Sequence, residues 1–242
     1  MSFDPINPVA LIASAATGVG AACARELAQR ADGGLILADP DEAALEACAD
    51  SLDRAPERVS TLAFNPADPT RWTDAADFIA AHYGRLDWAL IDAGAAFPRH
   101  EGYLEYTQRG LEAIMPLIGD NRDGGAIVLM TSAAVLSEEL RAGAEGGLMD
   151  LLRETARRGD RRQVRVGALA FGNPQAEMWT ETPLFDDMIR EHGGIANAFS
   201  QIAQTAPPIV RHPGASLASL IPMMISEASG GGVLVVDGGH TL

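Results

Sequence analysis

Short apolar segments alternate with longer amphipathic segments along the whole chain. Seven segments of five to seven residues are apolar on both faces, which is typical of strands buried inside a sheet. They lie at residues 9–13, 34–38, 59–64, 88–93, 126–131, 164–170 and 233–237. Strands that alternate with helical stretches indicate parallel pairing through crossover helices. The pattern predicts one doubly wound α/β domain over residues 1–242, with a mostly parallel seven-stranded sheet flanked by helices.

Acidic residues, proline and glycine mark the ends of the predicted helices. Asp41 places negative charge at the start of one helix, and Pro69 opens another that we expect to end near Gly84. A third helix is expected over 137–158, with a serine followed by two glutamates at its N-terminus. The segment 172–212, rich in proline, threonine and glycine, is the longest one without a clear strand. It predicts a lid or substrate loop.

Composition narrows the range of partners and of compartments. The 242 residues are 47% hydrophobic, which is enough for one sizeable core. A formal net charge of −15 repels nucleic acid and anionic lipid surfaces, so small molecules or proteins are the expected partners. No apolar run approaches the ~18 residues that span a bilayer, and the first residues contain no basic region. We expect a soluble cytoplasmic protein.

The two cysteines and five histidines do not form a metal-binding pattern. Cys23 and Cys48 lie in helix-like stretches without a second cysteine or a histidine at ligand spacing. They are expected to be small buried side chains in a reducing compartment. The histidines also lack the partners of a catalytic triad. The sequence therefore predicts no metal site.

A glycine-bearing turn follows the first predicted strand and opens a helix. Gly18 and Gly20 remove side chains that would block the approach of a pyrophosphate to the backbone N–H groups. The next strand ends at Asp39, about twenty residues on, where a carboxylate accepts hydrogen bonds from ribose hydroxyls and repels the extra phosphate of NADP. The alternative is structural, with both glycines serving helix packing and Asp39 capping the next helix.

Four motifs in order resemble those of the short-chain dehydrogenase/reductase family, and the resemblance covers nearly the whole chain. They are D-W-A-L-I-D-A-G (87–94), G-G-A-I-V-L-M-T-S (124–132), V-R-V-G-A-L-A-F-G (164–172) and V-L-V-V-D-G-G (233–239). The resemblance implies a Rossmann-like fold and hydride transfer between NAD(P) and a carbonyl or alcohol. In that family a Ser, a Tyr, a Lys and usually an Asn perform the chemistry. A fold-level resemblance does not by itself establish activity.

Only one member of the implied catalytic set is present. Ser132 matches the motif serine, whereas Arg141 stands at the Tyr position and Glu145 at the Lys position. Residues 133–163 contain neither tyrosine nor lysine, whatever the alignment. The Asn position falls near Tyr103.

The cofactor positions implied by the resemblance are partly changed. The family motif T-G-x-x-x-G-x-G begins here with Ala13 and Ser14, although its last two glycines are retained. Asn65 replaces the acid that usually faces adenine. The full set carried over is Ser14, Gly18, Val19, Gly20, Asp39, Asn65, Ala93 and Gly94.

Arginine and glutamate do not reproduce tyrosine and lysine chemistry. Arg141 keeps its proton to above pH ~12, and Glu145 supplies negative charge where lowering a phenol pKa requires positive charge. Spaced i,i+4, the two predict an ordinary ion pair. Two other interpretations stay open. One is rewired catalysis, with Glu145 as acid/base or Arg141 as an anion anchor beside Ser132, and the other is a misaligned helix.

Three functional hypotheses follow from these residues. The favoured one is a catalytically inactive homologue that acts as a structural or binding subunit, in a homo-oligomer or with an active paralogue. It retains residual binding of NAD, preferred over NADP because of Asp39, or has lost it. The second is an active NAD-dependent oxidoreductase with unusual acid/base groups, and the third is an NAD(H)-binding sensor. None of them specifies a substrate.

Overall fold

The computed structural model describes residues 7–16, 18–66, 68–93, 103–133, 145–171, 190–191, 193, 217–227 and 232–236. The strands are β1 (Val9–Ala13), β2 (Gly34–Asp39), β3 (Val59–Ala63), β4 (Trp88–Asp92), β5 (Gly125–Ser132), β6 (Val164–Phe171) and β7 (Val233–Val236). The helices are α1 (Gly18–Ala28), α2 (Glu42–Asp50), α3 (Pro69–Tyr83), α4 (Tyr103–Gly119), α6 (Glu145–Asp160) and α10 (Ile221–Glu227), with a short 3₁₀ helix at Pro56–Arg58.

The strands form one seven-stranded sheet in the order β3-β2-β1-β4-β5-β6-β7. Every neighbouring pair is parallel, which confirms the predicted fold class. Because β1 lies between β2 and β4, the chain winds outward from β1 in both directions. The carboxyl ends of β1 and β4 therefore flank the switch point where ligands bind in such sheets.

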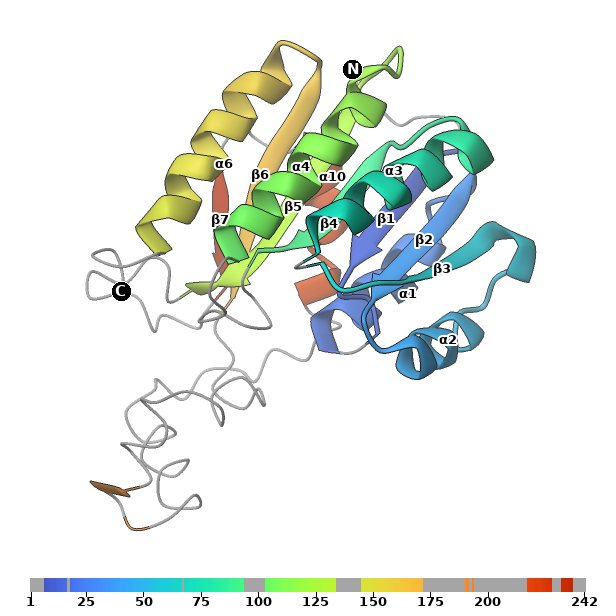
Figure 1. The fold of residues 1–242 in the computed structure, drawn as a ribbon, viewed down its shortest axis with the longest axis horizontal. Helices are drawn as coiled ribbons and strands as arrows, with labels where there is room; N and C mark the ends of the chain where they lie inside the picture. Colours follow the sequence, from blue (N-terminus) through green and yellow to red (C-terminus); the bar gives the residue numbers. More distant parts are fainter. Residues whose placement is uncertain are drawn as a thin grey trace.

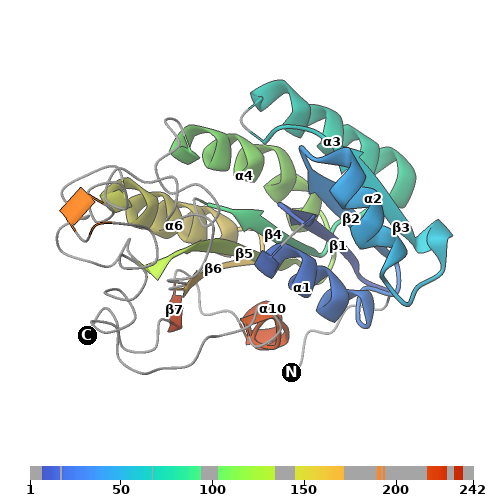
Figure 2. The same ribbon diagram turned by 90° about the horizontal axis from the view of Figure 1, so that it is seen from below.

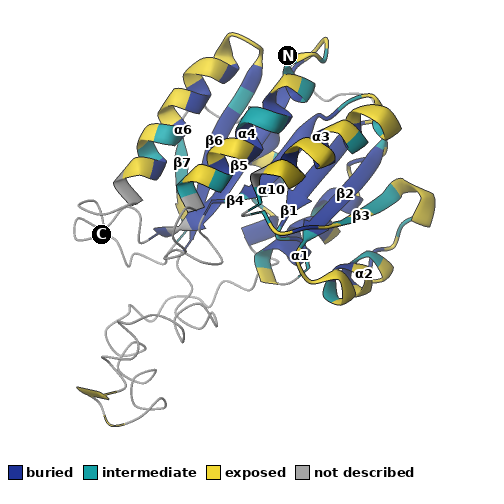
Figure 3. Ribbon diagram, viewed as in Figure 1, coloured by how far each residue is buried: buried dark blue, intermediate teal, exposed yellow. Residues whose placement is uncertain are grey.

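Helices cover both faces of the sheet, so its inner strands are buried on both sides, whereas the edge strands β3 and β7 are half-buried or exposed (Figures 1–3). One hydrophobic cluster joins the sheet to α1, α2 and α10, and the other joins it to α3, α4 and α6. Leu11 and Ile12 are adjacent in β1 but belong to opposite clusters, and both are fully buried. Burial on both faces is the physical reason that the inner strands are continuously apolar in sequence.

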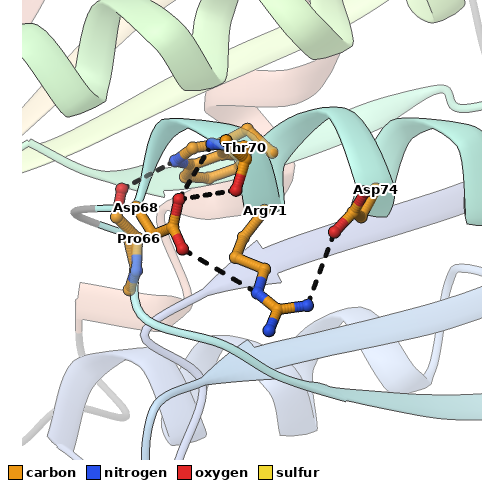
Figure 4. A network of polar contacts seen from close by, with 6 residues as sticks. Pro66, Asp68, Thr70, Arg71 and Asp74 are labelled. Carbon is orange, nitrogen blue, oxygen red and sulfur yellow. Dashed lines mark hydrogen bonds and ion pairs between the residues drawn. The ribbon is translucent and has the colours of Figure 1, made fainter.

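The predicted start and end of α3 are confirmed in detail. Its N-cap Asp68 accepts hydrogen bonds from the backbone N–H of Thr70 at 3.0 Å and from the Thr70 hydroxyl at 2.7 Å (Figure 4). Both bonds lower the pKa of Asp68, and the bond from the Thr70 hydroxyl is the larger cause. Trp72 donates to the carbonyl of Pro66 at 2.9 Å, which anchors the first turn. Gly84 ends the helix in the left-handed conformation, with φ of 70°.

A carboxylate staples the strands at their amino-terminal edge. Asp87 is fully buried, and one of its oxygens accepts a hydrogen bond from the backbone N–H of Val9 at 2.8 Å. Arg85 donates to both carboxylate oxygens, at 2.9 and 2.5 Å, and this bonding raises the arginine pKa. Asn121 adds a donor at 3.3 Å. One side chain thus connects the beginnings of β1 and β4 to the loop before β5.

Further expectations from the sequence can be compared with the described residues. Cys23 and Cys48 are buried and free, as predicted, and burial raises the pKa of Cys23 to about 12. Asp41 caps α2 by accepting from the Ala44 N–H at 3.0 Å. The helix expected over 137–158 is described from Glu145 to Asp160, and its predicted start lies outside the described residues.

Membrane-spanning helices and metal-binding clusters can be searched for only in the part of the chain that the structure describes. Within it, no helix is long and apolar enough to cross a bilayer. The same residues contain no cluster of three or more histidines, cysteines and acids that could hold a metal ion. Nearly all of the predicted loop 172–212 lies outside the described residues.

Candidate functional site

Among the described residues of the turn between β1 and α1, two lie in the left-handed region. Gly18 has φ of 58°, and a Cβ placed on it would meet no atom within 4 Å. Ser14 has φ of 62°, a conformation that glycine adopts at little cost and that costs an L-residue ~1–2 kcal/mol. The backbone shape that favours glycine at this position is therefore kept, although the glycine is replaced.

Gly20 has a different task from Gly18. A Cβ on Gly20 would lie 1.8 Å from the carbonyl oxygen of Ser14, so the first turn of α1 packs directly on the end of β1. Gly20 is buried, whereas Gly18 is exposed. Between them, Val19 is half-buried and packs against the core. The alternative interpretation, in which the glycines serve helix packing, therefore applies to Gly20. Gly18 instead leaves open space in front of the turn.

Asp39 ties the glycine turn to the end of β2. One carboxylate oxygen accepts a hydrogen bond from the backbone N–H of Ala16 at 3.1 Å, and the other accepts from the N–H of Asp41 at 3.1 Å. The N–H of Ala15 donates to the carbonyl of Ala38, also at 3.1 Å. A carboxylate has about four lone-pair sites, so these two bonds leave Asp39 able to accept further donors.

The neighbouring strand ends complete this edge of the sheet. Asn65 is exposed and follows β3 by two residues. The end of β3 pairs with the end of β2, where Ala63 is opposite Asp39. Ala93 is fully buried after β4 and donates its N–H to the carbonyl of Met130 at 2.8 Å. Asp92 ends β4 half-buried. Gly94 lies outside the described residues.

The catalytic positions are only partly described. Ser132 is the last residue of β5 and is paired with Phe171 of β6, at the carboxyl edge of the sheet. Glu145 is the first residue of α6, and Arg141 lies outside the described residues, so the ion pair proposed between them stays a prediction. Nothing is described of the Ser132 and Glu145 side chains.

The chain's tyrosines can be placed in the same way. Tyr83 ends α3, where its hydroxyl lies 2.7 Å from the Ser60 hydroxyl. Tyr106 is half-buried on α4 and packs against the core. Tyr103 begins α4, and its side chain lies outside the described residues.

Comparison with known proteins identifies the family. The model of the family described as short chain dehydrogenase matches residues 8–187, so the chain belongs to this family of oxidoreductases. A similar characterised protein is the cis-4-hydroxycyclohexanecarboxylate dehydrogenase of Sinomonas cyclohexanicum. The two are 28% identical over 253 residues, which covers 96% of each chain.

Solved structures show the same fold across almost the whole chain. L-sorbose reductase from Gluconobacter frateurii, complexed with NADPH and L-sorbose, superposes with a TM-score of 0.77 at 21% identity, over 99% of this chain and 98% of the other. Carveol dehydrogenase from Mycobacterium avium, in complex with NAD, also gives 0.77, at 20% identity and over 99% of both chains. At these identities the likeness establishes the fold and leaves the site to be argued from this chain's own residues.

Sequence reasoning located the turn and the acid but missed how they are joined. The bond from Ala16 N–H to Asp39 connects residues 23 positions apart, and no local pattern marks it. The different tasks of Gly18 and Gly20 were also hidden, because spacing alone treats the two alike. A run of four arginines within residues 157–162 was a visible signal that remained unused.

Proposed function

We propose that this protein is a catalytically inactive short-chain dehydrogenase that binds NAD(H) and acts as a structural or binding subunit of an oligomer. One observation carries the inactive part: the chain has no lysine, and its last tyrosine is Tyr106, before the β5 serine. The turn geometry supports the binding part, because Gly18 leaves open space while Asp39 braces the turn. The subunit would pair with itself or with an active relative.

The residues at the turn fit a nicotinamide dinucleotide. The open space at Gly18, at the N-terminus of α1, allows a pyrophosphate to approach backbone N–H groups and the positive end of the helix. Asp39 would accept hydrogen bonds from the adenosine ribose, and Asn65 lies after the adjoining strand for the adenine side. When bound, NAD supplies a hydride acceptor, and the protein supplies position and charge.

Asp39 should make the site prefer NADH to NADPH. Its carboxylate repels a 2′-phosphate, whereas an amide in the same place does not. We expect Asp39→Asn to narrow the preference for NADH about tenfold, which corresponds to ~1.4 kcal/mol. Calorimetric titration of each dinucleotide into wild type and variant measures the two ratios.

Asp50→Asn is the matched control, because Asp50 is an exposed acid at the end of α2 and loses the same charge away from the turn. Its ratio of affinities should stay at the wild-type value. Failure of the wild-type protein to bind either dinucleotide, with folding verified by thermal unfolding, would reject the binding part of the proposal. The structural-subunit part would then stand alone.

The inactive part rests on the proton chemistry that the substituted positions lack. Arg141 stays protonated, and Glu145 cannot lower the pKa of a phenol as the family lysine does, so the two do not reproduce the tyrosine–lysine route by which the family transfers a proton to the carbonyl that is reduced. A serine such as Ser132 can donate a hydrogen bond to a substrate oxygen, but without a base it is no nucleophile, and alone it supplies no acid/base group at neutral pH. The second candidate, an active NAD-dependent oxidoreductase, is favoured by the dehydrogenase of Sinomonas cyclohexanicum that aligns along 96% of the chain.

We expect the wild-type protein to show no hydride transfer above background with NADH or NAD, measured by absorbance with a panel of carbonyls and alcohols. The panel includes cis-4-hydroxycyclohexanecarboxylate, the compound in the name of the similar dehydrogenase. The double variant Arg141→Tyr with Glu145→Lys should gain activity, because it restores the acid/base pair of the family. Its rate is expected to rise by ~10²-fold or more over the wild-type background, the usual contribution of general acid/base catalysis.

A wild-type rate above background would contradict the inactive proposal. Loss of that rate in Glu145→Gln would then identify rewired catalysis and favour the second candidate. A rise in the rate of an active family member when this protein is added would support the subunit role. If the protein binds NADH without turnover, both alone and mixed with an active family member, the result would agree with the sensor hypothesis.

A further inference from the structure

A pocket of about 200 Å³ lies between α4 and α6, near the ends of both helices. It is lined by Glu112, Met115, Pro116, Arg158, Arg161 and Arg162. The two helices lie side by side in Figures 1 and 2. Because α6 runs back to the start of β6, this pocket lies at the amino-terminal edge of the sheet, opposite the glycine turn.

The charge of this region differs from that of the rest of the molecule. Residues 157–162 contain four arginines and one aspartate, in a chain whose net charge is −15. All four arginines are exposed, and none forms an ion pair with any residue that the structure describes. Like charges held this close repel one another, and a bound anion would remove that repulsion.

The acid of the pocket does not neutralise these arginines. Glu112 accepts hydrogen bonds from Gln108 at 2.8 Å and from Arg109 at 3.3 Å, both on its own helix. Its carboxylate is therefore engaged along α4, and it forms no ion pair with the described arginines of the 157–162 segment.

Packing holds one of the arginines close to the pocket. A Cβ on Gly119 would lie 2.9 Å from the Cβ of Arg162, so the stem of this arginine packs on the end of α4. Only a glycine leaves room for that contact. This contact restrains the stem of Arg162, and Arg162 also lines the pocket, so less of its side-chain freedom is lost on binding.

We propose that this arginine pocket binds a small polyvalent anion carrying phosphate or carboxylate groups. Its volume is below the ~300–1,000 Å³ of pockets for drug-sized ligands, so the ligand is small. Guanidinium groups bind phosphate and carboxylate oxygens in bidentate fashion, and three of them line this space. The site is separate from the proposed nucleotide site and does not depend on it.

Inorganic pyrophosphate and citrate are the two probes, titrated separately by calorimetry at constant ionic strength set with sodium chloride. We expect at least one to bind with a Kd below ~1 mM and to raise the temperature of unfolding. Which of the two binds identifies phosphate or carboxylate as the recognised chemistry. Arg158→Gln and Arg161→Gln should each weaken binding about tenfold, as expected for losing a hydrogen bond to a charged group.

Arg153→Gln is the matched control, because Arg153 lies on the same helix and pairs with Asp150 outside the pocket. It should leave the affinity unchanged. Circular dichroism verifies that all three variants fold. The proposal is overturned if neither anion binds the wild-type protein, or if all three variants weaken binding equally. It is also overturned if light scattering shows that the pocket arginines alter self-association while no anion binds, since a second copy's acidic surface would then be the occupant.

Discussion

Replacing Asp87 with alanine is expected to lower the free energy of unfolding by ~4 kcal/mol. The carboxylate is fully buried and serves the Val9 N–H, Arg85 and Asn121 at once. Its loss leaves a buried donor and a cation without their acceptor, and removing one partner of such a pair costs ~3–5 kcal/mol. Urea unfolding followed by circular dichroism measures the change.

Two matched variants test whether the position of Asp87 causes this loss. Asp87→Asn keeps one acceptor oxygen and should cost about half as much, ~2 kcal/mol. Asp74→Asn removes an exposed carboxylate paired with Arg71, which should cost less than ~0.5 kcal/mol. Equal losses in Asp87→Ala and Asp74→Asn would contradict the role of Asp87 as a staple between strands.

Gly20→Ala is expected to destabilise the protein by ~3 kcal/mol, with a fall of about 10 °C in the unfolding temperature. The added methyl group would lie 1.8 Å from the Ser14 carbonyl, so α1 must move away from β1. Gly18→Ala adds the same methyl group where no atom lies within 4 Å. Its cost is limited to placing alanine at φ of 58°, about 1–2 kcal/mol.

Gly18→Ala should impair NADH binding more than Gly20→Ala does, although Gly18→Ala costs less stability. In Gly18→Ala the methyl group occupies the space proposed for the pyrophosphate, so affinity should fall about tenfold while the protein stays folded. Calorimetry at a temperature well below unfolding separates the two effects. A Gly18 variant that binds NADH as tightly as wild type would show that the open space at the turn does not receive the cofactor.

The sheet was predictable because its inner strands are buried on both faces and its strands form short apolar segments. Each predicted strand from 9–13 to 233–237 agrees with an observed strand to within two residues at its ends. The crossover helices were predictable from their terminal residues, as Pro69 and Gly84 show for α3. Both signals are local, since burial of a segment and the capping of a helix depend on residues close in sequence.

Parts of the candidate site could not be predicted from local signals. Spacing identified Gly18, Gly20 and Asp39 as a group but could not assign Gly20 to packing and Gly18 to open space. That distinction depends on where the Ser14 carbonyl lies in relation to α1. The staple at Asp87 was likewise hidden, because its partner Val9 is 78 positions away.

By itself, the sequence determined the order of strands and helices, the family resemblance and the absence of lysine from the whole chain. It did so because apolar periodicity, capping residues and composition are written in consecutive residues. Only the tertiary structure decided that Asp39 braces the glycine turn and that Asp87 joins β1 to β4. It also brought the arginines of α6 to a pocket beside α4. Each of these contacts joins residues far apart in the chain, and they meet only after the sheet and its helices have packed.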